Sequence, residues 1–389
     1  MIDTVVLQID LSKSKISIRE DAYNMWTPSL IGVLCPPFDN RKGMRKFVNN
    51  PTERDKKNWG YLPYLTCYVD TRRNDLRETL YIQFSAPKLI FGNNFSEVGD
   101  SDFNMLCDRL YKKLYQRGIY VPSASYLSEC DVKAIHYCKN IVYTDGTTPS
   151  SIIRLMHKSN ISYHKNTNES KYKNGGESCH FYTLGECFCA YDKRKELRRS
   201  KLSKRGRVEN DDDYSQMRLF DETPIHEPFQ VLRLEHRLEG KKAINRNLVK
   251  NGIVSPSPTF KDLYDSSISK CILTNKMREI DNNIPSVAKC TQDIVSFMEC
   301  LHVLNPGASF PLKLKAVAAR AILNEAGVRD FRKAIGATDK QWFDFVNDLS
   351  KVKIPVRSFV GFDEVYRQLE SFTPVKLENY IDKMSDIDI

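Results

Sequence analysis

The sequence lacks any apolar run long enough to cross a lipid bilayer. Its first residues, MIDTVVLQIDLSKS, alternate like a β-strand and lack the basic flank and long apolar centre of a signal peptide. Both absences argue against a secreted or membrane-spanning protein. We therefore expect a cytoplasmic protein with no membrane partner.

A metal-binding motif and a nucleotide-binding motif are also missing. No Cys-x-x-Cys pair occurs among the eleven cysteines. Cys187 and Cys189 would share one strand face, where a closed zinc site is hard to build without further paired ligands, so we expect buried free thiols. The chain has no Gly-x-x-x-x-Gly-Lys-Ser/Thr loop, which excludes a nucleoside triphosphatase of that type.

What the chain does have is positive charge. Its 389 residues are 41% hydrophobic, enough for about two or three folded domains. The formal net charge is +10 at pH 7. Basic proteins without an anionic partner are common, but this excess favours a polyanion, and nucleic acid is the leading candidate.

The hydrophobic pattern predicts an α+β fold. Up to about residue 91 the chain reads as short strands, including TLYIQFSAPKLIFG, that would form a mostly antiparallel sheet. Helical spacing predicts flanking helices over 102–119 and 150–159, and polar loops are expected near 164–178 and 208–224. We predict a domain over 1–285 and a smaller all-helical C-terminal domain over 286–389.

Tyr191 stands where an apolar strand meets a basic run. Asp192 is a possible N-cap of a following helix. A tyrosine at the end of a strand most often packs over the hydrophobic core and has no catalytic role. Beside Lys193, however, and with a bound divalent ion polarising a phosphate, its phenolate becomes an accessible nucleophile. We expect the run to contact DNA through Lys195, Arg198, Arg199 and Lys201.

A second polar pattern lies in QVLRLEHRLEG. Alternation places Arg233, Glu235 and Arg237 on one strand face. Such a face is usually solvated and carries cross-strand ion pairs. The functional alternative makes Glu235 a ligand for Mg²⁺ or Mn²⁺ and the arginines phosphate clamps. His136 could share that ion if its strand lies beside the Glu235 strand.

Five segments resemble the gene II replication initiators of filamentous phages and their plasmid and bacterial relatives, and they occur in the family's order. The segments are MID at the start, SAPKLIFGNN, VKAIHYCKN, AYDKRKEL and LRLEHRL. The resemblance implies a nickase-like catalytic core. It gives Tyr191 the role of nicking nucleophile, with Lys193 beside it, and matches the arginine, glutamate and arginine of the family to Arg233, Glu235 and Arg237. Where the family has an acidic residue on the earlier strand, this chain has His136. The His-x-His motif of other nickases is absent.

The resemblance further implies an endonuclease that starts rolling-circle replication of phage or plasmid DNA. It would nick one strand of origin DNA through a 5′-phosphotyrosine, use Mg²⁺ or Mn²⁺, and depend on a host helicase and polymerase. Two alternatives stay open. One is a transposase or recombinase that uses the same tyrosine chemistry, and the other is a relative that binds DNA without cutting it.

A last motif lies in DDDYSQMRLFDE. Gln216, Leu219 and Phe220 have the Gln-x-x-Leu-Phe spacing of peptides that bind the bacterial sliding clamp. The alternative, weighted equally, is that the apolar residues pin this loop to the protein's own core. The predicted partners are therefore origin DNA, helicase, polymerase and a sliding clamp.

Overall fold

The computed structural model gives the arrangement of most of the chain. It describes residues 1–31, 43–70, 77–159, 169–173, 176–202, 229–290, 293–325, 328–354 and 362–380.

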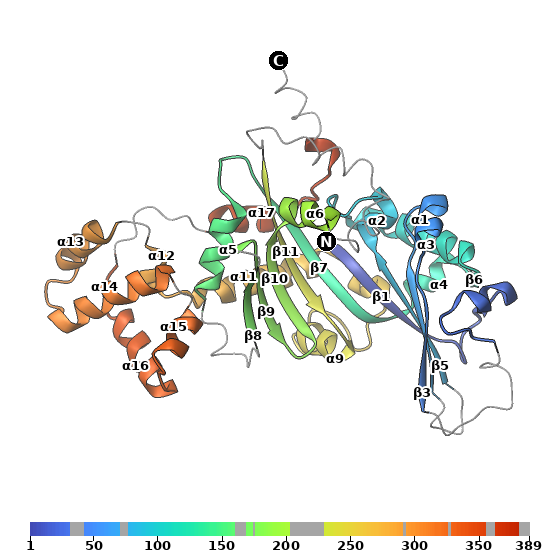
Figure 1. Ribbon diagram of the computed structural model, residues 1–389, viewed down its shortest axis with the longest axis horizontal. Helices are drawn as coiled ribbons and strands as arrows, with labels where there is room; N and C mark the ends of the chain where they lie inside the picture. The colour runs from blue at the N-terminus through green and yellow to red at the C-terminus, as the bar shows by residue number, and fades with distance from the viewer. Residues whose placement is uncertain are drawn as a thin grey trace, which may run out of the picture.

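A single large antiparallel sheet organises these residues (Figure 1). In spatial order its nine described strands are β3 (Met44–Asn49), β4 (Tyr64–Asp70), β5 (Arg77–Ser85), β1 (Ile2–Asp10), β7 (Asp131–Tyr143), β11 (Gln230–Leu238), β10 (Glu186–Asp192), β9 (Ser178–Thr183) and β8 (Glu169–Lys173). All neighbouring strands pair antiparallel. A separate small sheet pairs β2 (Ser17–Ile18) with β6 (Ile119–Tyr120). The predicted α+β class with an antiparallel sheet is confirmed.

One face of this sheet forms the hydrophobic core. On β11, Leu232 and Leu234 are fully buried on this face. Burying such a side chain contributes about 1.5–3 kcal/mol to stability, which favours the strand register that the alternation predicted. The packed helices include α3 (Phe103–Gln116), α5 (Pro149–His157) and α11 (Ser266–Asn282), whose buried residues belong to the same clusters as the strands. The first two fall where the sequence predicted helices. The other α-helices described in this part are α1 (Glu53–Trp59), α2 (Ala86–Phe91), α4 (Ala124–Ser128), α6 (Lys193–Leu202), α9 (Lys241–Ile244) and α10 (Phe260–Leu263).

The reading of residues 86–91 as strand was wrong, because the chain turns into helix α2 directly after β5. Pro87 occupies the first turn, where its missing N–H costs nothing. Ala86, Leu89 and Ile90 bury one helical face, and Gly92 ends the helix with a left-handed φ of 74°. The apolar run carries helical spacing as well as strand-forming residues.

The loop predicted near 164–178 was wrong in part, since it contains strand β8 and the first residue of β9. Backbone pairing from Glu169 with Tyr182 to Lys173 with Ser178 adds β8 to the sheet edge. The polar sequence has no alternation that would have indicated this strand. The loop predicted near 208–224 lies outside the described residues.

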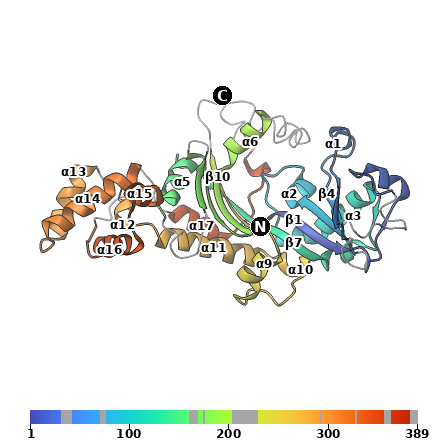
Figure 2. The ribbon, with the colours of Figure 1, turned by 60° about the horizontal axis from the view of Figure 1, so that its bottom comes forward.

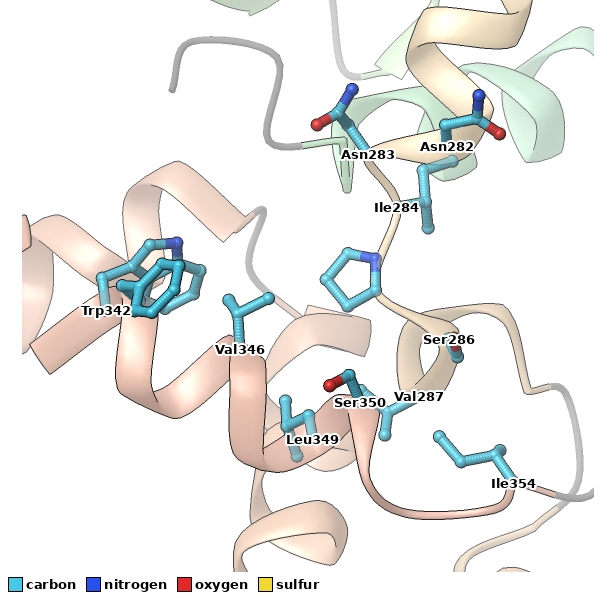
Figure 3. A pocket seen from close by; sticks show the side chains of 12 residues that line it. Asn282, Asn283, Ile284, Ser286, Val287, Trp342, Val346, Leu349, Ser350 and Ile354 are labelled. Atoms are coloured by element: carbon cyan, nitrogen blue, oxygen red, sulfur yellow. The ribbon is translucent and has the colours of Figure 1, made fainter. Parts of the chain in front are cut away.

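The C-terminal region is helical, as predicted. Its helices are α12 (Ser286–Lys289), α13 (Ile294–Leu304), α14 (Phe310–Glu325), α15 (Val328–Ala334), α16 (Asp339–Ser350) and α17 (Asp363–Ser371). Figure 1 shows α12 to α16 extending beyond the sheet, whereas α17 returns to it. There Gln368 hydrogen-bonds the backbone N–H and C=O of Val142. A largely apolar pocket of about 370 Å³ lies between residues 282–287 and α16 (Figure 3).

A buried ion pair joins the C-terminal segment to the sheet. The Glu97 carboxylate accepts hydrogen bonds from the Lys139 ammonium at 2.8 Å and from the Val375 N–H at 2.9 Å. Glu97 is 1% exposed. The pair therefore couples β7, the loop after α2 and residues 373–377 in one desolvated junction.

The sequence predicted free thiols and no membrane-spanning segment, and the described part of the chain bears on both. The ten cysteines found there are free, and eight of them are buried. Within the same residues, no helix combines the length and apolarity that spanning a membrane requires.

Candidate active site

The polar face of the sheet brings three predicted site residues together. β11 lies between β7 and β10, so that Arg237 pairs with His136 and Glu235 with Cys189 across the strands. Tyr191 ends the same face of β10 and pairs with Arg233. The strands of His136 and Glu235 are therefore neighbours, which was the condition for a shared metal site.

Glu235 is the centre of this group. Its Oε2 accepts hydrogen bonds from the Tyr191 hydroxyl at 3.2 Å and from the Arg237 guanidinium at 2.9 Å. Its Oε1 lies 3.4 Å from Nδ1 of His136. The other imidazole nitrogen, Nε2, lies 2.8 Å from Oε1 of Glu239. Strand faces with this polar pattern are usually solvated, but here the carboxylate of Glu235 is buried.

The charges in this group depend on one another. Burial alone favours a neutral carboxyl, but the Arg237 guanidinium and then His136 hold the pKa of Glu235 well below its usual range. Burial likewise opposes protonation of His136, yet hydrogen bonds to Glu235 and Glu239 raise the pKa of His136 to about 9. Burial, followed by the Glu235 charge, raises the pKa of Tyr191 well above its usual value. Without a further cation, the phenol is held protonated.

Asp3 is the site residue that sequence reasoning missed. One oxygen each from Asp3 and Glu235 and one nitrogen of His136 lie within 4.8 Å of one another. The register of β1 against β7 shifts between Ile2 and Val5, and Asp3 lies at this β-bulge. Bulges re-aim side chains beside active sites. The resemblance of MID to the start of the initiator family was the only sequence signal at this position.

Two carboxylates and an imidazole suit a small divalent cation. Carboxylate oxygens are the preferred ligands of Mg²⁺, and Mn²⁺ accepts imidazole as well. To serve as a ligand, His136 must release the proton that its acidic neighbours stabilise. The donor set therefore fits the predicted Mg²⁺ or Mn²⁺ and adds Asp3 to His136 and Glu235.

Lys193 begins helix α6 immediately after the Tyr191 strand. Asp192 caps this helix, as predicted, by accepting a hydrogen bond from the Lys195 N–H at 3.0 Å. The Lys193 ammonium lies 5.8 Å from the centre of the Tyr191 ring and 3.0 Å from Glu196 Oε2. Burial lowers the pKa of Lys193, while Glu196 opposes that shift. Figure 2 shows α6 and α11 on opposite sides of the strands.

The predicted DNA-binding residues have different surroundings. Arg233 is 1% exposed and donates hydrogen bonds to Asp3, to the backbone carbonyl of Asn94 and to Asn140. Its guanidinium thus holds Asp3 in place. The side chains of Arg237 and Lys195 are 35% and 45% exposed, so both are accessible from solvent.

Several predicted positions carry no side-chain description. The side chains of Arg198, Arg199 and Lys201 in α6 are outside what the structure describes, and so are Gln216, Leu219 and Phe220.

Comparisons with protein-family models, with curated proteins and with solved structures find no match to this chain in any of the three.

Proposed function

We propose that the protein nicks and rejoins one strand of DNA through a covalent bond to Tyr191. The observation that carries this proposal is the 3.2 Å hydrogen bond from the Tyr191 hydroxyl to Glu235, because Glu235 is also one of three possible ligands for a hard cation. A nucleophile and a charge-stabilising site for a phosphate then lie side by side.

In the first step the Tyr191 oxygen attacks the phosphorus of a phosphodiester. A bond from this oxygen to phosphorus forms, the bond from phosphorus to the 3′ oxygen breaks, and the phenolic proton is balanced by protonation of the leaving 3′ oxygen. Glu235 orients the phenol by accepting its hydrogen bond. The Lys193 ammonium, beside the ring, favours the phenolate.

Asp3, His136 and Glu235 would hold the divalent cation, which supplies positive charge for the phosphate in the transition state. Arg233 keeps Asp3 in position, and Arg237 does the same for Glu235. The exposed part of Arg237 provides a second contact for the phosphate.

Rejoining is the same reaction in reverse. A 3′ hydroxyl attacks the phosphotyrosine and releases Tyr191, so the ester bond is conserved without nucleotide hydrolysis. The family resemblance makes initiation of rolling-circle replication on phage or plasmid DNA the proposed setting. A free 3′ hydroxyl would prime a host polymerase, and a host helicase would open the duplex.

Tyr191→Phe tests the proposal. We expect the variant to lose nicking and the covalent 5′ adduct on a supercoiled plasmid that carries the protein's own locus, with Mn²⁺ present. Only a hydroxyl is removed, so folding should be weakened by about 1 kcal/mol and DNA affinity should hardly change. The measurement is nick mapping together with detection of protein-linked DNA.

Tyr182→Phe is the matched control, since Tyr182 projects from β9 on the same sheet face and pairs with Cys187. It should nick normally. An adduct that persists in Tyr191→Phe and disappears in Tyr182→Phe would move the nucleophile to Tyr182. Tight DNA binding by the wild type with no nick under these conditions would favour the non-catalytic alternative.

A further inference from the structure

A second group of possible metal ligands lies on the same face of the sheet. Cys187 and Cys189 lie two residues apart on β10 and therefore point to the same face. His180 on the neighbouring β9 pairs directly with Cys189. One ligand atom from each of the three residues lies within 4.8 Å of the others. The fold thus supplies the additional ligand whose absence from the local sequence argued against a zinc site.

We propose that His180, Cys187 and Cys189 bind a zinc ion. In a tetrahedral site with bonds of about 2.0–2.3 Å, ligand atoms are about 3.5–3.8 Å apart. The observed cluster therefore needs to contract by at most about 1.3 Å, within the reach of side-chain rotation. Three protein ligands leave the fourth position to water.

The surroundings suit the charge of this ion. Cys187 and Cys189 are 7% and 0% exposed, and the Cys189 thiol donates a 3.8 Å hydrogen bond to Oε2 of Glu235, so thiolates would form here only with a bound cation beside them. Binding releases two thiol protons to solvent, and the two thiolates then neutralise Zn²⁺. The neighbouring Arg237 is already paired with Glu235, so it adds no uncompensated charge. Nδ1 of His180 is buried without a hydrogen-bond partner among the described residues, and the His180 side chain lies within hydrogen-bond reach of Cys187.

A disulfide is the main competing use of two neighbouring cysteines. Residues i and i+2 of a strand are about 6.6–6.8 Å apart, which is the upper limit for a disulfide. Cys187 and Cys189 are both free in the structure. Zinc spans this separation without a bond between the sulfurs, so the strand geometry favours the metal.

The proposed ion differs from the one assigned to Asp3, His136 and Glu235. Thiolates are soft ligands that select zinc, whereas the two carboxylates favour Mg²⁺ or Mn²⁺. Zinc would fasten β9 to β10 two residues before Tyr191. The proposal concerns binding alone and holds whether or not the protein cuts DNA.

Cobalt provides the test. The full chain is purified under reducing conditions, freed of metal with a chelator and titrated with Co²⁺. We expect a near-ultraviolet thiolate-to-cobalt charge-transfer band that Zn²⁺ removes by displacement. Cys187→Ser and Cys189→Ser should each weaken zinc binding by more than about 100-fold, because loss of an outer-sphere partner alone costs about 10 to 100-fold. His180→Ala should weaken it similarly.

Two control variants make the result specific. Cys179→Ser changes a buried cysteine of the opposite sheet face and should keep the band. His136→Ala removes a ligand of the other site and should also keep it. The proposal is overturned if the reduced wild type shows no thiolate band, a result that needs no variant to fold. It is also overturned if His180→Ala leaves zinc affinity unchanged, or if peptide mapping of protein purified without a reductant finds Cys187 and Cys189 joined in a disulfide.

Discussion

Asp3 has one observed contact and one proposed role, which a pair of substitutions can separate. Its Oδ1 accepts a 2.7 Å hydrogen bond from Arg233, and one of its oxygens belongs to the proposed cation site. Asp3→Asn keeps an oxygen that can accept the arginine hydrogen bond but removes the negative charge. Asp3→Ala removes both the charge and the oxygen.

The loss of stability expected for the Asp3 variants follows from the burial of the pair between Asp3 and Arg233. Breaking a fully buried ion pair costs about 3–5 kcal/mol. The Asp3 side chain is 18% exposed and Arg233 keeps its contacts with Asn94 and Asn140, so we expect about 2 kcal/mol for Asp3→Ala. Asp3→Asn keeps one hydrogen bond and should cost about 1 kcal/mol.

Mn²⁺ affinity, unlike stability, should fall to a similar extent in the two variants. Both variants lose a charged ligand, so Mn²⁺ binding should weaken by about 10-fold or more in each. The assays are isothermal titration with Mn²⁺ and urea denaturation. Asp10→Asn is the control, because it makes the same change at the other end of β1, outside the ligand group. Wild-type Mn²⁺ affinity in folded Asp3→Asn would refute the assignment of Asp3 as a ligand, and an undiminished free energy of unfolding in Asp3→Ala would refute the importance of its pair with Arg233.

Two further predictions concern stability and DNA affinity. Glu97→Ala leaves the Lys139 ammonium buried without its carboxylate and should lower the free energy of unfolding by about 3–5 kcal/mol in urea denaturation; a loss below about 1 kcal/mol would contradict this. Replacing four basic residues of α6 with glutamine should reduce the slope of log K for binding single-stranded DNA against log salt by up to about 3 units. Replacing four exposed basic residues elsewhere should not reduce it. Equal slopes in the two variants would mean that the basic run is merely solvated. The first variant changes Lys195, Arg198, Arg199 and Lys201, and the control changes Lys13, Lys15, Arg54 and Lys57.

The fold could be predicted as far as local periodicity reaches. Alternation in β11 separates Leu232 and Leu234 from Arg233 and Glu235, and the structure has these two faces. Periodicity could not show that the polar face is buried, since this depends on β7 and β10 flanking β11 in the sheet. It also failed for β8, whose pairing with β9 rests on backbone hydrogen bonds rather than on alternating side chains.

The candidate site was predictable where a motif or a charge marked the residue. Tyr191, Lys193, His136 and Glu235 could be selected in this way, and the sheet brings them close together. Asp3 could not, because alternation continued from Val5, Leu7 and Ile9 would place residue 3 on the core face. The register shift after Ile2 reverses that placement. His180 was missed because its relation to Cys189 is a cross-strand pair.

The charges around Glu235 connect the proposed metal site to the proposed substrate. Asp3, Glu235 and Glu239 contribute three negative charges, and Arg233, Arg237 and protonated His136 contribute three positive charges. The buried network is therefore formally neutral without any ligand. Replacing the imidazole proton with a divalent cation would add one net positive charge. A phosphodiester carries one negative charge, so the cation-loaded site would match a single phosphate of the proposed DNA substrate.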